Sequence, residues 1–215
     1  MIRVCKSPTE PATLASKGYK DDAVRTAIDA DQDGKCYLCE REMGTDMQVE
    51  HLKSQKHAAH LKNVWTNLFL ACSYCNGKKL ENYDGILDPT GSDIEKLIRH
   101  RYDSAQDEFV FLPTDDHPTA EVSKTINLLN LIFNGAKPGL STIKERKFKR
   151  QFQSAYVAFN DCLSAYLKNP CSNTRQKVAD ALSHKAEFLG FKYWIILSSP
   201  VLAQEFKTEI IWNKK

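Results

Sequence analysis

Apolar residues in the second half of the chain recur every three or four positions, as one face of a helix requires. The pattern predicts helices over 119–134 and 142–168, from 172 toward 190, and from Ser199 onward. Pro170 ends the second of them, because proline in a helix interior removes a hydrogen bond and clashes with the preceding turn. We therefore expect a mainly helical region here.

The first half of the chain has shorter and less regular elements. A helix is expected over 21–30, a strand over 47–51 and another strand over 108–112, with turn residues between them. The composition shifts after Pro113, and the boundary predicted near residue 90 divides the chain into a module at 1–90 and a mainly helical region at 91–215. Together these elements predict an α+β fold that is mainly helical.

The composition is that of an ordinary globular protein. Hydrophobic residues make up 42% of the 215 residues and charged residues 27%, so neither disorder nor a membrane class is indicated. The apolar stretches are far shorter than the roughly 20 residues that span a bilayer, and the N-terminus lacks the apolar run of a secretory signal. We expect a cytoplasmic protein. A formal net charge of +3 is compatible with a nucleic-acid partner but does not require one.

Four of the seven cysteines form two Cys-x-x-Cys pairs, Cys36 with Cys39 and Cys72 with Cys75. Each pair suits two corners of a tetrahedral zinc ion, and the alternatives are buried free thiols or a redox pair. Four thiolates would fill the coordination shell and leave no position for water or substrate. The predicted zinc is therefore structural, and catalysis would need another ion.

A competing hypothesis for the same region is a calcium site. The segment from Asp29 to Glu40 satisfies the spacing of an EF-hand loop, with aspartates at alternate positions and a glycine at the sixth. Against it, Cys36 stands where such loops usually carry an aliphatic residue, and the sequence contains no second loop to pair with the first. Zinc is the favoured interpretation of this segment.

Residues 30–80 resemble the zinc-knuckle variant of the HNH nuclease motif. The resemblance rests on Glu50-His51, on Asn67, and on Asn76 directly after the second cysteine pair. It implies a two-stranded hairpin followed by a helix, with His51 on the first strand and Asn76 on the helix. The expected architecture is thus a small ββα-metal HNH module with a structural four-cysteine zinc site, plus a C-terminal helical region.

The same resemblance implies a role for each of these side chains in phosphodiester hydrolysis. His51 would be the general base that deprotonates water, which its unperturbed pKa of about 6.5 suits. Glu50 and Asn76 would supply hard oxygen ligands to one Mg²⁺ or Mn²⁺ ion, and Asn67 would orient His51 through a hydrogen bond to the backbone. The substrate would be DNA or RNA, because such a site recognises a phosphate rather than a base or a sugar hydroxyl.

Basic residues near these positions are candidates for contact with nucleic acid. Lys78 and Lys79 follow Asn76 and could meet phosphates as point charges, although a solvated helix face is an equal alternative. The densest basic cluster of the chain lies at the start of the helix expected over 142–168 and could make salt-sensitive contacts to a nucleic-acid backbone. It comprises Lys144, Arg146, Lys147, Lys149 and Arg150.

A broader resemblance extends over the whole chain. Leu87 to Pro89, the helix from Lys124 to Leu131 and the segment from Ser199 to Leu202 are similar to the PtuB-like HNH subunit of Septu and retron-associated antiphage defence systems. This resemblance implies an effector nuclease that forms a complex with an ABC-type ATPase. The chain departs from the family where Leu52 to Gln55 follow the Glu-His pair in place of an aromatic residue and an Arg-Pro pair.

Two functional hypotheses follow from these observations. In the first, the protein is a metal-dependent endonuclease, and the helical region at 91–215 binds the ATPase partner. In the second, zinc stabilises a nucleic-acid or protein-binding module without catalysis. A magnesium-dependent nicking assay with a His51→Ala control distinguishes the two.

Overall fold

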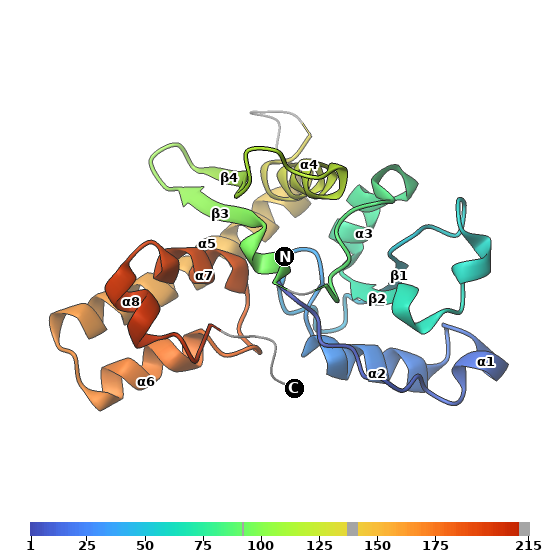
Figure 1. Ribbon diagram of the computed structural model, residues 1–215, viewed down its shortest axis with the longest axis horizontal. Coiled ribbons are helices and arrows are strands. Elements are labelled where there is room, and N and C mark those ends of the chain that lie inside the picture. Colours follow the sequence, from blue (N-terminus) through green and yellow to red (C-terminus); the bar gives the residue numbers. More distant parts are fainter. Residues whose placement is uncertain (92, 137–141, 211–215) are drawn as a thin grey trace.

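The computed structural model describes residues 1–91, 93–136 and 142–210 (Figure 1). Helices provide most of its regular structure, and the strands form two small antiparallel sheets. The expected α+β, mainly helical class is therefore confirmed.

The first helices lie close to the N-terminus. α1 (Leu14–Lys17) is a single turn, and α2 (Asp22–Gln32) confirms the helix expected over 21–30. Asp21 caps α2, because its side chain accepts a hydrogen bond of 3.2 Å from the backbone amide of Ala23. The aspartates that begin this segment therefore set the start of the helix.

The calcium interpretation is wrong. Asp29 and Asp31 lie inside α2, where the backbone is helical, so they cannot wrap around a cation as loop residues do. The carboxylate of Glu40, which would close the loop, is buried and accepts a hydrogen bond of 2.8 Å from the backbone amide of Gly190. Glu40, which the motif assigned to calcium, therefore binds the backbone of a distant part of the chain.

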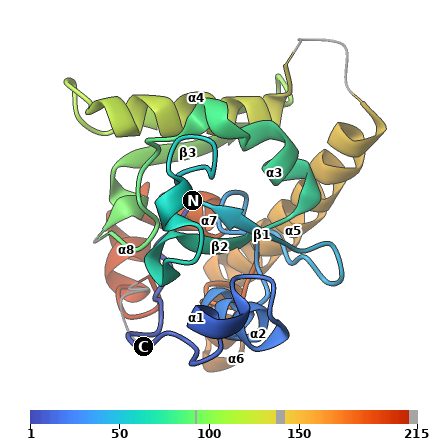
Figure 2. The same cartoon turned by 90° about the vertical axis from the view of Figure 1, so that its right-hand side faces the viewer.

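A hairpin and a helix form the ββα unit that the resemblance implied. β1 (Gln48–His51) pairs antiparallel with β2 (Leu68–Ala71), and Glu50 lies opposite Phe69 in the register. α3 (Ser73–Lys79) follows β2 directly. Figure 2 shows α3 beside the β1–β2 hairpin. The strand that carries Glu50 and the helix that carries Asn76 are thus neighbours.

Polar groups hold this unit against the preceding helix. The connection between β1 and β2 contains two short 3₁₀ helices, η1 (Ala59–Leu61) and η2 (Trp65–Asn67). The buried side-chain amide of Gln32, at the end of α2, donates a hydrogen bond of 2.8 Å to the carbonyl of Leu70 and accepts one of 2.8 Å from its backbone amide. One glutamine thus satisfies both backbone groups of Leu70, on the edge of β2 that no other described strand covers.

A second hairpin is formed by β3 (Ile98–Asp103) and β4 (Glu108–Pro113). The sequence predicted β4 but not β3. The buried positions of β3 are Ile98 and His100, and a histidine counts as polar in a hydrophobic pattern, so the alternation was not recognised. Two further 3₁₀ helices precede this hairpin, η3 (Glu81–Tyr83) and η4 (Ile94–Lys96).

The rest of the described chain is helical. Thr119, Thr142 and Ser199 each cap a helix by accepting a hydrogen bond from the backbone amide three residues later. The three helices start where the sequence predicted. Among the described residues, no helix has both the length and the apolar composition needed to cross a membrane. The helices are α4 (Ala120–Asn134), α5 (Ile143–Lys168), α6 (Ser172–Ala181), α7 (Leu189–Leu197) and α8 (Pro200–Glu205).

The helix expected from 172 toward 190 is wrong in its extent. α6 ends at Ala181, and a separate helix, α7, begins at Leu189. α7 buries side chains on several faces, among them Phe191, Tyr193 and Ile196. A helix that is apolar on most sides lacks the one-sided pattern by which surface helices are predicted.

The main hydrophobic core joins elements from both sides of residue 90. It contains Phe69 of β2, Phe109 of β4, Phe152 of α5 and Phe191 of α7. A second cluster lies among the end of α5, α6, α7 and α8. In Figure 1, α6 to α8 lie at one end of the molecule and the ββα unit at the other, with β3, β4 and α4 across the top. The ββα unit is therefore anchored in a core that it shares with the later elements.

Candidate active site and four-cysteine cluster

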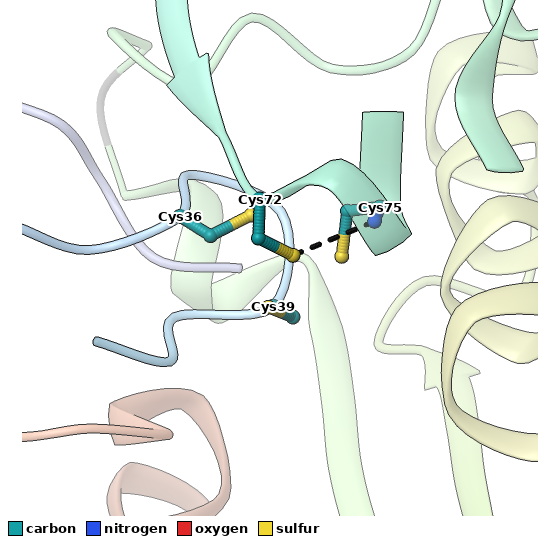
Figure 3. A group of neighbouring side chains, drawn as sticks. All are labelled: Cys36, Cys39, Cys72 and Cys75. Atoms are coloured by element: carbon teal, nitrogen blue, oxygen red, sulfur yellow. Dashed lines mark hydrogen bonds between the residues drawn. The ribbon is translucent and has the colours of Figure 1, made fainter. Parts of the chain in front are cut away.

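Cys36, Cys39, Cys72 and Cys75 form one buried cluster (Figure 3). Their Sγ atoms all lie within 4.8 Å of one another. A tetrahedral zinc ion with Zn–S bonds of about 2.3 Å places its sulfur ligands about 3.8 Å apart, so a small contraction of the cluster accommodates the ion. The four sulfur donors are buried and soft, and their number fills a tetrahedral shell, so the cluster fits a structural zinc site.

Two backbone segments position the four thiols. The first pair lies in a turn after α2, which is closed by a hydrogen bond of 2.8 Å from the amide of Glu40 to the carbonyl of Cys36. In the second pair Cys72 caps α3, and its sulfur accepts a hydrogen bond of 3.4 Å from the amide of Cys75. Burial raises the pKa of the Cys39 and Cys75 thiols, so their thiolate forms need a cation beside them.

Glu50 is buried between the first cysteine turn and α3. Its Oε2 accepts a hydrogen bond of 2.5 Å from the hydroxyl of Tyr37, and its Oε1 lies 2.8 Å from the ammonium of Lys79. Burial raises the pKa of the Glu50 carboxyl, while Lys79 and Tyr37 favour its ionised form. Each carboxylate oxygen has a further lone pair, so the group can bind a cation while it keeps both partners.

Lys79 lies inside the protein and not on the surface, where a phosphate contact was expected. Its side chain is fully buried, and its ammonium donates to the carbonyl of His51 at 3.0 Å. The ammonium also lies 3.7 Å from Oδ1 of Asp84, in addition to its ion pair with Glu50. A buried charge requires such partners to offset its lost hydration. In this conformation Lys79 supports Glu50 and β1 rather than a ligand.

Lys78 is half-buried, and it is also paired. Its ammonium lies 2.7 Å from Oε1 of Glu145, the residue that completes the capping box of α5. This ion pair connects α3 to the start of α5, where Lys144 and Lys147 are exposed. The basic cluster that the sequence indicated therefore begins next to the ββα unit.

His51 has one ring nitrogen engaged by the backbone. Its Nε2 lies 2.9 Å from the carbonyl oxygen of Lys62, and Nε2 carries the proton because a carbonyl only accepts hydrogen bonds. The lone pair is then on Nδ1, which faces the side-chain amide of Gln55 at 3.5 Å. The ring of Tyr19 packs against the imidazole, with the ring centroids 4.8 Å apart. Burial lowers the pKa of His51, so its neutral, basic form is favoured.

Asn67 holds together the connection between β1 and β2. Its Oδ1 accepts a hydrogen bond of 2.8 Å from the amide of Lys53, and its Nδ2 donates to the carbonyls of Lys53 at 3.0 Å and Leu61 at 3.2 Å. Leu61 directly precedes Lys62, whose carbonyl receives the hydrogen bond from His51. Asn67 therefore reaches His51 only through the backbone of this connection.

Asn76 and Glu50 line the same seam between α3 and β1. The carboxamide of Asn76 donates a hydrogen bond of 2.7 Å to Oε1 of Gln48, which lies two residues before Glu50 and thus on the same face of the strand. Lys79, about one turn after Asn76, contacts Glu50. The fold therefore brings two hard oxygen donors, Glu50 and Asn76, to one seam.

Two side chains of this site were not expected from the sequence, Tyr37 and Asp84. Asp84 accepts hydrogen bonds from the amide of Ser54 at 2.8 Å and from its hydroxyl at 2.7 Å, and it lies 2.9 Å from Nδ1 of His57. A tyrosine inside a Cys-x-x-Cys pair suits a buried aromatic residue, and an aspartate before a glycine suits a turn. The sequence around Tyr37 and Asp84 therefore gave no indication that these residues contact Glu50 or Lys79.

Residues 36–81 match the HNH endonuclease family. This segment contains the four-cysteine cluster, the β1–β2 hairpin, α3 and the side chains that lie along their seam. The family match therefore covers the same segment in which the candidate site residues come together.

The chain is also similar to the Septu protein PtuB of Bacillus mycoides (strain KBAB4), with 21% identity over 152 residues. The similarity covers 63% of this chain and 50% of PtuB, so the chain spans about half the length of the relative that it matches. Residues 36–81 therefore carry an HNH endonuclease domain, and the similarity to PtuB agrees with the HNH, PtuB-like resemblance that the sequence indicated.

Proposed function

We propose that this protein is a metal-dependent HNH endonuclease that hydrolyses phosphodiester bonds of DNA or RNA. The observation that carries the proposal is the environment of His51. Its Nε2 is bound to the Lys62 carbonyl, which leaves a basic Nδ1 on the strand that also carries Glu50. The match of residues 36–81 to the HNH endonuclease family supports the same conclusion.

His51 acts as the general base in this proposal. Nδ1 takes a proton from a water molecule, and the hydrogen bond from Nε2 to the Lys62 carbonyl stabilises the imidazolium that forms. The side chain of Gln55 lies against Nδ1 and must move before water reaches that atom. The lowered pKa of His51 keeps the ring unprotonated at neutral pH, as a base requires.

Glu50 and Asn76 hold a divalent cation, Mg²⁺ or Mn²⁺, at the seam between β1 and α3. Both residues offer the oxygen donors that these hard ions prefer. When bound, such an ion stabilises the charge on the phosphorane and on the leaving oxygen. The four-cysteine cluster takes zinc, and that zinc is structural because four sulfur ligands leave no open position.

A nicking assay tests the proposed chemistry. The purified protein is incubated with supercoiled plasmid DNA or with RNA, in Mg²⁺, in Mn²⁺ or in EDTA. Cleavage that depends on the divalent ion and disappears in His51→Ala supports the proposal. Cleavage that persists in EDTA or in His51→Ala contradicts it.

The second candidate is a zinc-stabilised nucleic-acid or protein-binding module without catalysis. One observation favours it, because both oxygens of Glu50 already have partners within the chain, as those of a structural carboxylate would. Such a module binds nucleic acid or protein. It cleaves neither DNA nor RNA in the presence of Mg²⁺ or Mn²⁺. His51→Ala then leaves its binding affinity unchanged.

We further propose that the protein is the effector of an ATPase-coupled antiphage complex. The similarity to the Septu protein PtuB supports a defence role. In this proposal residues 1–90 are the nuclease module, and residues 91–215 bind an ABC-type ATPase. Large apolar side chains are exposed on helices of the second region, where they are available for contact with a partner. They include Val157 and Leu167 of α5 and Val201 of α8.

Co-expression with an ATPase from the same gene cluster, followed by size-exclusion chromatography, tests the partner. A shared peak that Val157→Glu and Leu167→Glu disrupt supports the assignment of α5 to the contact. Separate elution of the two unmodified proteins contradicts the partner proposal and leaves the nuclease chemistry untouched.

A further inference from the structure

Each Cys-x-x-Cys pair encloses one buried tyrosine whose hydroxyl makes a hydrogen bond of 2.5 Å. Tyr37, in the first pair, donates to Oε2 of Glu50. Tyr74, in the second pair, donates to the backbone carbonyl of Ile132 in α4. Tyr37 directly follows the first cysteine of its pair, whereas Tyr74 directly precedes the second cysteine of its pair. Of the two, Tyr37 is the one that contacts a residue of the candidate active site.

The ring of Tyr37 is held on the hairpin by two contacts. It stacks on Phe69 of β2 with the ring centroids 5.0 Å apart, and its backbone amide donates a hydrogen bond of 3.2 Å to the carbonyl of Leu70. Phe69 lies opposite Glu50 in the strand register. The position of the hydroxyl at Glu50 is therefore set by the turn that carries the first cysteine pair.

Glu50 is oriented by two donors from different segments. Lys79 of α3 lies at Oε1, and Tyr37 of the cysteine turn lies at Oε2. Donors on both oxygens fix the plane of the carboxylate, whereas an ammonium alone is a point charge and leaves that plane free. Glu50 is only 6% exposed, so little water is available to replace a missing donor.

We propose that Tyr37 is a positioning residue that makes the affinity of Glu50 for the divalent cation depend on zinc in the four-cysteine cluster. The inference rests on the proposed function, in which Glu50 is a ligand of that cation. Zinc holds the turn that carries Tyr37, and the Tyr37 hydroxyl orients Glu50. Coupling between two binding sites is reciprocal, so a cation at Glu50 also strengthens zinc binding.

Tyr37→Phe is the direct test, because it removes the hydroxyl and keeps the ring that stacks on Phe69. Loss of a hydrogen bond to a metal ligand typically weakens metal binding about 10- to 100-fold, and we expect a loss of Mn²⁺ affinity in that range. Tyr74→Phe removes an equally short hydrogen bond from the second pair. We expect it to bind Mn²⁺ as the wild type does.

The measurement is isothermal titration of the zinc-loaded proteins with Mn²⁺. The wild type, Tyr37→Phe, Tyr74→Phe and Glu50→Gln are compared, with zinc content from elemental analysis and melting temperature recorded for each. Weaker Mn²⁺ binding in Tyr37→Phe than in Tyr74→Phe, at equal zinc content, is the expected result. Because both variants lose one buried hydroxyl, a general loss of stability does not produce this difference.

Two outcomes separate failure of this inference from failure of the proposed function. If Glu50→Gln binds Mn²⁺ more weakly than the wild type but Tyr37→Phe and Tyr74→Phe bind it equally, the role of Tyr37 is overturned and the cation site stands. If Glu50→Gln binds Mn²⁺ as tightly as the wild type, the cation site at Glu50 is itself overturned.

The wild-type protein provides a second test that does not depend on the folding of a variant. Its zinc affinity is measured by competition with a zinc-selective fluorescent chelator, with and without Mn²⁺. Tighter zinc binding in the presence of Mn²⁺ supports the coupling. An unchanged zinc affinity overturns it.

Discussion

The imidazole Nε2 of His51 lies 2.9 Å from the carbonyl oxygen of Lys62, which is 11 residues further along the chain. The contact fixes the tautomer, because the backbone acceptor requires the proton on Nε2 and leaves the lone pair on Nδ1. Asn67 stabilises this arrangement, since it donates a hydrogen bond of 3.2 Å to the carbonyl of Leu61, beside Lys62. The geometry of the base thus depends on a backbone contact in the long connection between β1 and β2.

We expect His51→Ala to lower the cleavage rate by about 10² to 10⁴, the usual effect of losing a general base. Zinc content and melting temperature should stay close to those of the wild type, because His51 is not a zinc ligand. His60→Ala is the matched control, since His60 is an exposed histidine in the same connection. Equal rates in the two variants, measured by plasmid nicking, would place the base elsewhere.

Elemental analysis of the purified protein should find one zinc per chain, because the cluster offers four sulfur donors within 4.8 Å of one another. In the double variant Cys36→Ser and Cys75→Ser we expect loss of zinc and unfolding of the HNH domain, since metal binding contributes directly to folding in such sites. Cys171→Ser, at an exposed cysteine, is the control. A double variant with the circular dichroism spectrum and melting curve of the wild type contradicts a structural metal.

Lys79→Met should destabilise the fold by about 3 to 5 kcal/mol, because it leaves the buried carboxylate of Glu50 without its cation. In the double variant Lys79→Met and Glu50→Gln we expect recovery of most of this loss, since no uncompensated charge remains. Urea denaturation measures both values. Lys56→Met is the control, because its ion pair with Glu81 is exposed and should contribute little to the free energy of unfolding. If both single variants lose a similar free energy of unfolding, the buried contact of Lys79 with Glu50 does not stabilise the fold more than an exposed ion pair does.

The exposed lysines at the start of α5 should contribute to binding of nucleic acid. Lys144→Ala with Lys147→Ala is expected to weaken binding and to lower the magnitude of the salt slope, by up to about 0.9 for each phosphate that the protein no longer neutralises. The measurement is fluorescence anisotropy of labelled duplex DNA over a range of salt concentrations. As a charge-matched control, Lys177→Ala with Lys185→Ala removes two exposed lysines from the region around α6. If the salt dependence of DNA affinity is equal in the two double variants, the effect comes from net charge in general and not from the lysines of α5.

Features that depend on near neighbours in the chain were predictable. The two Cys-x-x-Cys pairs indicated the cluster, because each pair places two sulfurs on one tight turn. The helix starts at Thr119, Thr142 and Ser199 were also found, because a cap acts on a backbone amide only three residues away. The order of strand, strand and helix in the HNH domain came from its resemblance to a known motif, whose spacing is local as well.

The tertiary structure alone decided which atoms meet at the site. Lys78 and Lys79 look alike in the sequence, but successive residues of a helix differ by about 100° in direction, so Lys79 points to Glu50 and Lys78 to Glu145. The hydroxyl of Tyr37 reaches the carboxylate of Glu50, 13 residues away, because the first cysteine turn packs against the β1–β2 hairpin. Such contacts arise when the core packs segments that are distant along the chain, and a pattern of neighbouring residues contains no information on that packing.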